Sequence, residues 1–476
     1  MNYETVIGIE IHLELKTKTK MFSGAPVAVN VPANSCVSGI DIALPGTLPQ
    51  LNKQAVKLSL MACKALNCEI DDLLLFDRKN YYYVDLTKGF QITQQFHPLG
   101  KNGSINISVD GKEKKIRINR IHLEEDTAKL FHHDDGTYMD FNRCSVPLVE
   151  IVSEADLRNG QEAMAYVEKL RSILYYLGVS DCKMEEGSLR CDVNISLRPY
   201  GYQGYGGRVE IKNLNSIANI AKAVDAEVAR QTAALNNGEE IEQATYRFDE
   251  NSKKTVLMRK KEGAVDYKYF PEPNIPPIRL SKEFINEAFQ EIGELPEERF
   301  NRYQELGLSK QDSQLLVNNK ALSDYFDKVC QYTEDYKGAC NWLVQDYSGY
   351  LSKNRLEVET AVIKPEYWSE LLQLLNDGSI SSKQAKSVFE EMTTGKSPKA
   401  IVKEKGIEQV SDDEVISEIV KQVLNNNPQS IKDYREGKDR ALGYLVGQVM
   451  KMSNGQVNPA KASALLKEAL TKTEEV

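Results

Sequence analysis

Three side chains able to bind a metal ion alternate along a short apolar stretch near the start of the sequence. Residues 7–15 read Ile-Gly-Ile-Glu-Ile-His-Leu-Glu-Leu, so Glu10, His12 and Glu14 take alternate positions. This alternation predicts a half-buried β-strand, because successive side chains of a strand point to opposite faces. Same-face neighbours lie roughly 7 Å apart, so adjacent pairs could share one cation. Two interpretations stay open here: a metal or catalytic site, or an ordinary solvated sheet face.

A second acidic cluster follows another β pattern and favours the first interpretation. Residues 122–126 read His-Leu-Glu-Glu-Asp. Just before them the apolar positions switch from even to odd numbers, which a β-bulge near Arg120 would explain. Periodicity therefore leaves open whether Glu124 or Glu125 faces the polar row of the first strand. Two such clusters brought together would suit a metal or phosphoryl-transfer site.

Further polar groups lie on later strand patterns. Glu150 is the one charged residue in the apolar run 146–152, where a carboxylate is costly unless it is paired or metal-bound. We favour metal binding or catalysis, although a structural salt bridge would also serve. The segments 191–197 and 208–214 predict a hairpin. Its polar faces hold Asp192, Asn194, Glu210 and Lys212.

Cations surround three consecutive tyrosines in residues 81–83. Arg78, Lys79 and Lys88 bracket them. The set suits a polyphosphate, with cations for the charge and aromatic rings for a base. Packing of the tyrosines within a strand is the other interpretation, and the commoner one.

The elements that position these residues indicate more than one domain. At 476 residues the chain exceeds a single core, so two or three domains are expected. Strand patterns interrupted by helices extend to the proline-rich segment 271–277, which marks a boundary. Helices are expected beyond it, at 281–292, 297–306, 310–332, 372–391, 439–452 and 459–470. Gly443 and Gly447 share one of these helices and would permit close approach, either of a packed helix or of RNA.

Composition and charge narrow the functional class. Hydrophobic residues make up 41% of the chain and charged residues 27%, with a net charge of −9. This balance argues against indiscriminate nucleic-acid binding. The 8 cysteines are scattered without a disulfide framework, and no apolar run approaches the roughly 20 residues of a membrane span. We therefore expect a reduced, cytoplasmic protein that does not enter a membrane.

The motifs taken together resemble, over the whole length, the B subunits of aspartyl/glutamyl-tRNA amidotransferases. The resemblance rests on many ordered matches rather than on one motif. The matching segments are residues 8–15, 44–46, 77–81, 88–92, 122–126, 146–152, 184–194, 212–216, 269–273 and 446–450.

This resemblance implies an α+β protein whose N-terminal antiparallel sheet forms a cradle similar to the glutamine synthetase catalytic fold. A helical domain and an α-helical tail domain that binds tRNA would follow, with expected boundaries at 1–290, 291–405 and 406–476. The implied reaction is ATP-dependent phosphorylation of the side-chain carboxylate of Glu or Asp on misacylated tRNA. Ammonia then displaces phosphate. The implied partners form a heterotrimer with this chain: an amidase (glutaminase) protein, which supplies ammonia through a channel, and a small third protein.

Carried over by position, the resemblance also implies a ligand set. Glu10, His12, Glu125 and Glu150 would be the catalytic metal ligands, with Asp192 as a further ligand. Carboxylates suit Mg²⁺, while the imidazole leaves room for Mn²⁺. Arg78, Lys79 and Lys88 would hold the ATP phosphates.

The chain departs from many relatives at a four-cysteine zinc knuckle. The corresponding positions are Ser23, Ala25, Ser38 and Asp41, so no zinc is expected. Two rival functions remain: a non-catalytic tRNA-binding scaffold and a metal-dependent hydrolase. Whether Glu-tRNA(Gln), Asp-tRNA(Asn) or both are substrates is left open.

Overall fold

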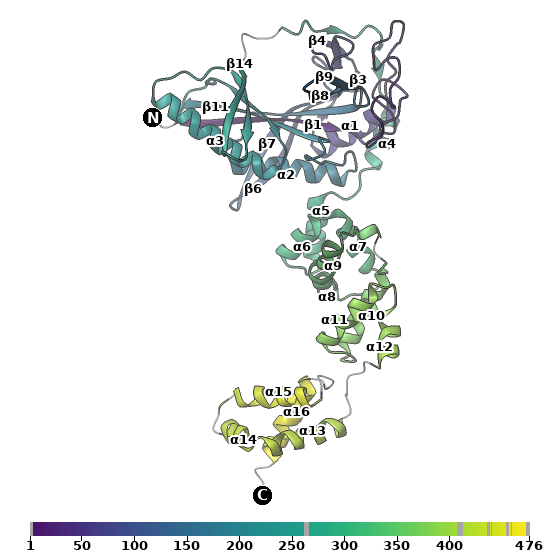
Figure 1. The fold of residues 1–476 in the computed structure, drawn as a ribbon, viewed down its shortest axis with the longest axis vertical. Helices are drawn as coiled ribbons and strands as arrows, with labels where there is room; N and C mark the ends of the chain where they lie inside the picture. Colours follow the sequence, from purple (N-terminus) through teal and green to yellow (C-terminus); the bar gives the residue numbers. More distant parts are fainter. Residues whose placement is uncertain are drawn as a thin grey trace. The chain divides into compact units, whose positions relative to one another are not determined.

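The chain forms two compact units, residues 1–296 and 297–476 (Figure 1). The computed structural model describes residues 3–260, 266–360, 362–406, 413–435, 438, 440–453, 457 and 459–472. The first unit is rich in strands and the second is helical, so the predicted α+β class is confirmed. The further division of the second unit near residue 406 stays a prediction.

A nine-stranded sheet forms the centre of the first unit, in the order β14-β13-β12-β11-β1-β10-β7-β6-β2. Neighbouring strands are antiparallel, except that β12 and β13 run parallel. The strands are β1 (Tyr3–Glu14), β2 (Glu69–Ile70), β6 (Gly100–Val109), β7 (Lys112–Glu125), β10 (Pro147–Ser153), β11 (Leu189–Pro199), β12 (Val209–Leu214), β13 (Ala244–Asp249) and β14 (Lys254–Lys260). The predicted strand over residues 7–15 is thus part of β1, at the middle of the sheet.

Three helices share the core with the apolar face of this sheet. They are α1 (Lys53–Ala65), α2 (Gly160–Tyr176) and α3 (Ile217–Asn236). Ile7, Ile9, Ile11 and Leu13 of β1 are fully buried in that core. Because side chains alternate along a strand, Glu10 and His12 lie on the opposite face. The alternating pattern therefore sets which face carries the polar row.

A β-bulge near Arg120 is confirmed, and it re-aims the end of β7. The register between β10 and β7 shifts between Val152 and Ser153, opposite the segment from Ile118 to Arg120. Apolar residues on both sides of this shift are buried in the same core. Bulges of this kind rotate the following side chains relative to the preceding ones.

Short strands complete the first unit beside the main sheet. β4 (Asp77–Asn80) pairs with β5 (Phe90–Thr93) and β15 (Phe270–Pro271) in a three-stranded sheet. Two further pairs are β3 (Leu73–Leu74) with β16 (Ile278–Arg279), and β8 (Lys129–His133) with β9 (Gly136–Asp140). Helix α4 (Lys282–Gln290) follows β16.

The second unit is helical, but two of the predicted helices are each divided. Its elements are α5 (Pro296–Glu305), which begins at the last residue of the first unit, α6 (Lys310–Val317), α7 (Lys320–Val329), α8 (Tyr336–Asn341), η1 (Trp342–Tyr347), α9 (Ser348–Asn354), η2 (Val358–Thr360), α10 (Pro365–Asn376), α11 (Ser382–Met392), α12 (Pro398–Lys405), α13 (Asp413–Asn426), α14 (Pro428–Arg435), α15 (Arg440–Met452) and α16 (Pro459–Lys472).

Local capping explains both divisions. The predicted helix over 310–332 was wrong as a single element, because the Asn319 side chain caps a new helix by accepting from the Leu322 amide. The predicted helix over 372–391 was wrong in the same way. Gly378 adopts a φ of 74°, and Ser381 forms a capping box with Gln384.

The last four helices have a core of their own, which includes Ile416, Leu445 and Leu466. A Cβ added at Gly443 or Gly447 would meet no described atom within 4 Å. Packing against the described helices therefore does not require either glycine. Within the described residues, no helix is long and apolar enough to cross a membrane.

Candidate metal-binding site

Four polar side chains stand side by side across the middle of the sheet. His12 of β1 is the register partner of Arg190 on β11 and of Glu150 on β10. Glu150 is in turn the partner of His122 on β7. Because directly opposite residues share a face, the row reads Arg190, His12, Glu150, His122 across four strands.

Glu124 joins this row and completes the first of two ligand groups. His12 Nε2 lies 3.3 Å from Glu124 Oε1 and 3.7 Å from Glu150 Oε2. We call His12, Glu124 and Glu150 the first cluster; one ligand atom from each lies within 4.8 Å of the others. One imidazole and two carboxylates in this arrangement could hold a single divalent cation.

His122 supports the first cluster from β7. Its Nε2 lies 3.0 Å from Glu150 Oε2 and 3.6 Å from Glu124 Oε2. Burial alone would lower the pKa of His122, but Glu150 and Glu124 together raise it to about 9. Burial likewise opposes the charge of Glu150, yet His122, His12 and Lys79 hold its pKa well below the usual range. The Glu150 carboxylate is thus kept ionised and ready to bind a cation.

A second cluster lies on the same face of the sheet. Its members on β1 and β11 lie two residues away from His12 and Arg190. It consists of Glu10, Asp192 and Glu210, whose ligand atoms also lie within 4.8 Å of one another. Glu10 and Asp192 are register partners on β1 and β11. Lys212 forms an ion pair with Asp192 and lies 3.0 Å from Glu210 Oε1.

Negative charge accumulates between the two clusters. Burial, followed by the charges of Glu150, Asp192 and Glu210, raises the pKa of Glu10 above its ordinary value. Four carboxylates therefore repel one another in a half-buried site. Such crowding is costly without cations, and hard oxygen donors fit Mg²⁺ or Mn²⁺. The residues present thus fit divalent metal ions.

The predicted ligand Glu125 lies outside both clusters. Its neighbour Glu124 faces His12, so the next side chain of β7 points to the other face. There Glu125 forms a buried ion pair with Lys88 and accepts from the Ser145 hydroxyl at 2.9 Å and the Ile92 amide at 3.1 Å. The structure thus groups Glu124, rather than the expected Glu125, with His12 and Glu150. The metal-ligand set itself stays a prediction.

The three predicted phosphate cations separate into different environments. Arg78 is held by Glu272 through two hydrogen bonds of 2.6 and 3.1 Å, and Lys88 by Glu125. Of the three, Lys79 interacts electrostatically with the first cluster. Although burial opposes its charge, Glu124, Tyr269 and Glu150 raise its pKa. Arg78 and Lys88 are thus committed to buried carboxylates in this structure.

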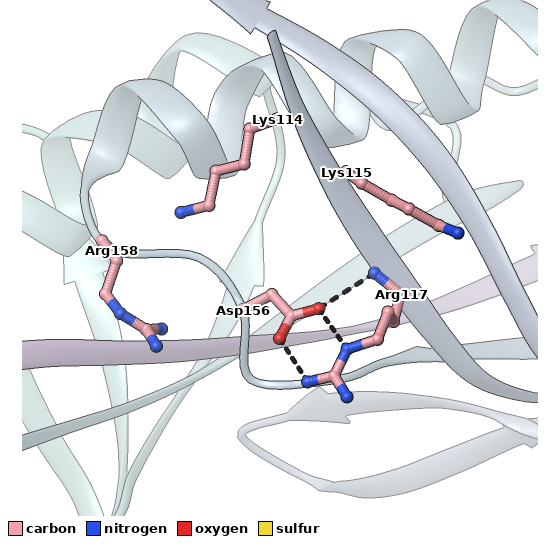
Figure 2. A pocket seen from close by; sticks show the side chains of 5 residues that line it. All are labelled: Lys114, Lys115, Arg117, Asp156 and Arg158. Carbon is pink, nitrogen blue, oxygen red and sulfur yellow. Dashed lines mark hydrogen bonds and ion pairs between the residues drawn. The ribbon is translucent and has the colours of Figure 1, made fainter.

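A pocket of about 490 Å³ lies elsewhere on the sheet, near the start of β7 (Figure 2). Its lining is Lys114, Lys115, Arg117, Asp156 and Arg158. Figure 2 shows the Asp156 carboxylate accepting hydrogen bonds from Arg117. The Arg117 Nη2 atom lies 2.6 Å from Asp156 Oδ1. Lys114 and Arg158 are likewise paired, with Glu162 and Glu4. Because these pairs offset most of its positive charge, the clusters are the better candidate site.

Comparison with known proteins identifies the family of this chain. Residues 5–286 match the family model described as the GatB/GatE catalytic domain, and residues 324–470 match the GatB domain. The chain belongs to this family. It is 50% identical over 475 residues to the B subunit of the aspartyl/glutamyl-tRNA(Asn/Gln) amidotransferase from Geobacillus thermodenitrificans, covering 99% of this chain and 100% of the relative. The B subunits from Bacillus velezensis and Staphylococcus epidermidis are 50% and 48% identical, with 99% of this chain and 100% and 99% of the relatives covered. The resemblance stated from the motifs is thereby confirmed, and both clusters lie within the matched catalytic domain.

Three residues of the site were not among the predicted ligands. Glu210 could have been found from β12, where alternation places it on the face shared with Asp192. His122 and Glu124 were masked by the bulge, because a shift of one residue exchanges the two faces of a strand.

Proposed function

We propose that this family member is the component that activates and amidates misacylated tRNA. ATP phosphorylates the side-chain carboxylate of Glu-tRNA(Gln) or Asp-tRNA(Asn), giving an acyl phosphate and ADP. Ammonia then attacks the acyl carbon, and phosphate leaves as the amide forms. The observation that carries the proposal is the pair of acidic clusters side by side in the matched catalytic domain.

The first cluster would hold one Mg²⁺ or Mn²⁺ through His12, Glu124 and Glu150. The second would hold another through Glu10, Asp192 and Glu210. Bound there, divalent ions would neutralise charge on the transferring phosphoryl group. His122 would keep Glu150 and Glu124 oriented, as residues behind metal ligands commonly do.

Two cations beside the first cluster are candidates to bind phosphate oxygens. The charge of Lys79 interacts with those of Glu124 and Glu150. Arg190, the register partner of His12, pairs with Asp126 at 2.7 Å, while its buried Nε has no hydrogen-bond partner among the described residues. An arginine beside a metal cluster suits a transferring phosphoryl group, whose charge is spread over three oxygens.

The names of the relatives support two further parts of the proposal. They describe one component of a larger amidotransferase that acts on tRNA. An amidase (glutaminase) partner would release ammonia, with a small third protein completing a heterotrimer in the cytoplasm. Glutamine would then be the amide donor of an ATP-dependent carbon–nitrogen ligase.

The testing experiment is amidation by the assembled complex with free ammonia in place of glutamine. Both misacylated tRNAs are assayed with and without ATP. We expect amide formation that requires ATP and releases one ADP for each amide. A non-catalytic scaffold would give no ATP turnover with either tRNA, and a metal-dependent hydrolase would act without ATP.

A further inference from the structure

Five aromatic rings follow one another near the three-stranded sheet of β4, β5 and β15. Successive ring centroids are 6.2 Å apart from Phe96 to Tyr269, 5.8 Å to Tyr267, 5.9 Å to Tyr81 and 6.3 Å to Tyr83. We call these five residues the aromatic row. Every successive pair meets edge to face, so the row continues as a chain of contacts rather than a single stack.

Three segments build the row: Tyr81 and Tyr83 follow β4, Phe96 follows β5, and Tyr267 and Tyr269 precede β15. Strand β4 pairs with β15, and the Asn80 amide donates to the Tyr267 carbonyl at 3.0 Å. The Asn80 side chain also donates to the Lys268 carbonyl at 2.7 Å. These bonds hold the segment of Tyr267 and Tyr269 beside that of Tyr81, so the row is fixed by backbone structure.

The two ends of the row remain open to solvent. Tyr83 is 56% exposed and Phe96 is 58% exposed, whereas the three inner rings are half-buried. A line of exposed aromatic rings leaves a large apolar area at the surface, because this area is not buried in the folded core. A ligand that stacks on rings could reach this area.

Cations accompany the rings. Lys79 Nζ lies 4.9 Å from the Tyr267 ring centroid and 5.7 Å from that of Tyr81. The Arg259 guanidinium donates to the Tyr83 hydroxyl at 2.8 Å. Positive groups beside aromatic rings are what single-stranded nucleic acid uses, because its bases stack while its phosphates need compensation.

The row also leads to the proposed chemistry. Lys79 contacts its inner rings, and its charge interacts with those of Glu124 and Glu150 of the first cluster. A nucleotide bound at the inner rings would therefore lie beside Lys79.

We propose that the aromatic row binds the unpaired 3′-terminal nucleotides of the RNA substrate by base stacking. The inference rests on the proposed function, which supplies an RNA carrying the amino acid at that end. One base covers one or two rings, whereas the row has five at spacings of 5.8–6.3 Å. A single strand of several nucleotides could contact all five rings, whereas the base of a free nucleotide could not.

The test compares tRNA affinities in the assembled complex, using Tyr83→Ala and Phe96→Ala. Each variant is measured with intact tRNA and with tRNA lacking its unpaired 3′ nucleotides. Loss of one base–ring stack should weaken binding of intact tRNA by about 5- to 100-fold and leave the shortened tRNA unchanged. Tyr83→Phe keeps the ring and should bind like the parent. Tyr205→Ala, an exposed tyrosine outside the row, is the matched control.

Three results would overturn the proposal. They are equal losses for intact and shortened tRNA, no loss with either RNA, or a weaker equilibrium binding of ATP with unchanged tRNA affinity. The last would assign the row to the nucleotide base. Because binding is measured without turnover, these results are separate from the ammonia-supported assay that tests the proposed function.

Discussion

The Nε2 atom of His12 lies 3.3 Å from Oε1 of Glu124, although a whole strand, β10, separates their strands in the sheet. Two side chains can meet across β10 because Glu150 stands between them on the same face, 3.7 Å from His12. This contact is the reason why we propose Glu124, rather than Glu125, as a metal ligand.

Glu14 lies on β1, the strand of His12, and should make the free energy of unfolding depend on pH. Burial, followed by the charge of Asp126, raises the pKa of Glu14 from 4.5 to about 7. The folded state thus binds more protons than the unfolded state between these values, so stability falls as pH rises through this window. Above it, ionised Glu14 costs about 1–3 kcal/mol.

Glu14→Gln removes this cost. We expect the variant to be more stable than the parent at pH 8 and nearly equal to it at pH 5. Urea unfolding of both proteins in chelator measures the difference. An equal difference at the two pH values would show that Glu14 does not titrate in this way.

A buried ion pair includes Asp41, one of the four positions at which the sequence predicts that no zinc is bound. Lys20 Nζ lies 3.1 Å from Asp41 Oδ2, and both side chains are fully buried. Asp41 also accepts from the Ser38 amide at 2.8 Å. Lys20→Met should cost about 3–5 kcal/mol, because it leaves a buried carboxylate without its cation.

The double variant Lys20→Met/Asp41→Leu should recover most of that stability, since replacing both charges leaves neither one unpaired. Thermal unfolding of the three proteins tests this. Elemental analysis of the parent should find no stoichiometric zinc. About one zinc per chain, or a double variant no more stable than Lys20→Met, would contradict the account.

Glu125 is expected to matter for the buried ion pair rather than for the metal. Its side chain and that of Lys88 are 4% and 10% exposed. Glu125→Gln leaves Lys88 without an opposite charge and should destabilise the protein by about 3 kcal/mol. Glu125→Gln/Lys88→Met is the matched control and should unfold at a higher temperature. Equal stability of Glu125→Gln and the parent would refute this role.

The alternating sequence of β1 predicted both the buried and the polar face correctly, because a period of two is a direct consequence of strand geometry. Glu150 could be singled out by its apolar neighbours. The choice between Glu124 and Glu125 could not be made, since a bulge of one residue at Arg120 exchanges the faces. The positions of Arg78 and Lys88 were also beyond the sequence, because Glu272 and Glu125 meet them only through tertiary pairing. Asn319 and Ser381 carried helix-starting signals that the helical periodicity around them obscured.

Removing residues 407–476 tests the predicted division of labour. Every ligand of the two clusters lies before this segment, so both metal sites should persist. We expect the truncated complex to hydrolyse glutamine, to bind tRNA more weakly and to amidate poorly at low tRNA concentration. Raising the tRNA concentration should restore part of the rate, because shape and backbone contacts set affinity. Unchanged tRNA affinity would make the tail structural.

Titration of the metal-free full-length chain with Mn²⁺, followed by the loss of the free-ion electron paramagnetic resonance signal, tests the central claim most directly. Four proteins are compared: the parent, His12→Asn, Glu124→Gln and Glu125→Gln. Glu124→Gln and His12→Asn should each weaken Mn²⁺ binding by at least about tenfold, because they remove ligands. In the parent, the Glu125 carboxylate is turned toward Lys88. Glu125→Gln should therefore bind Mn²⁺ like the parent. Unchanged binding by Glu124→Gln together with a tenfold loss in Glu125→Gln would contradict the assignment.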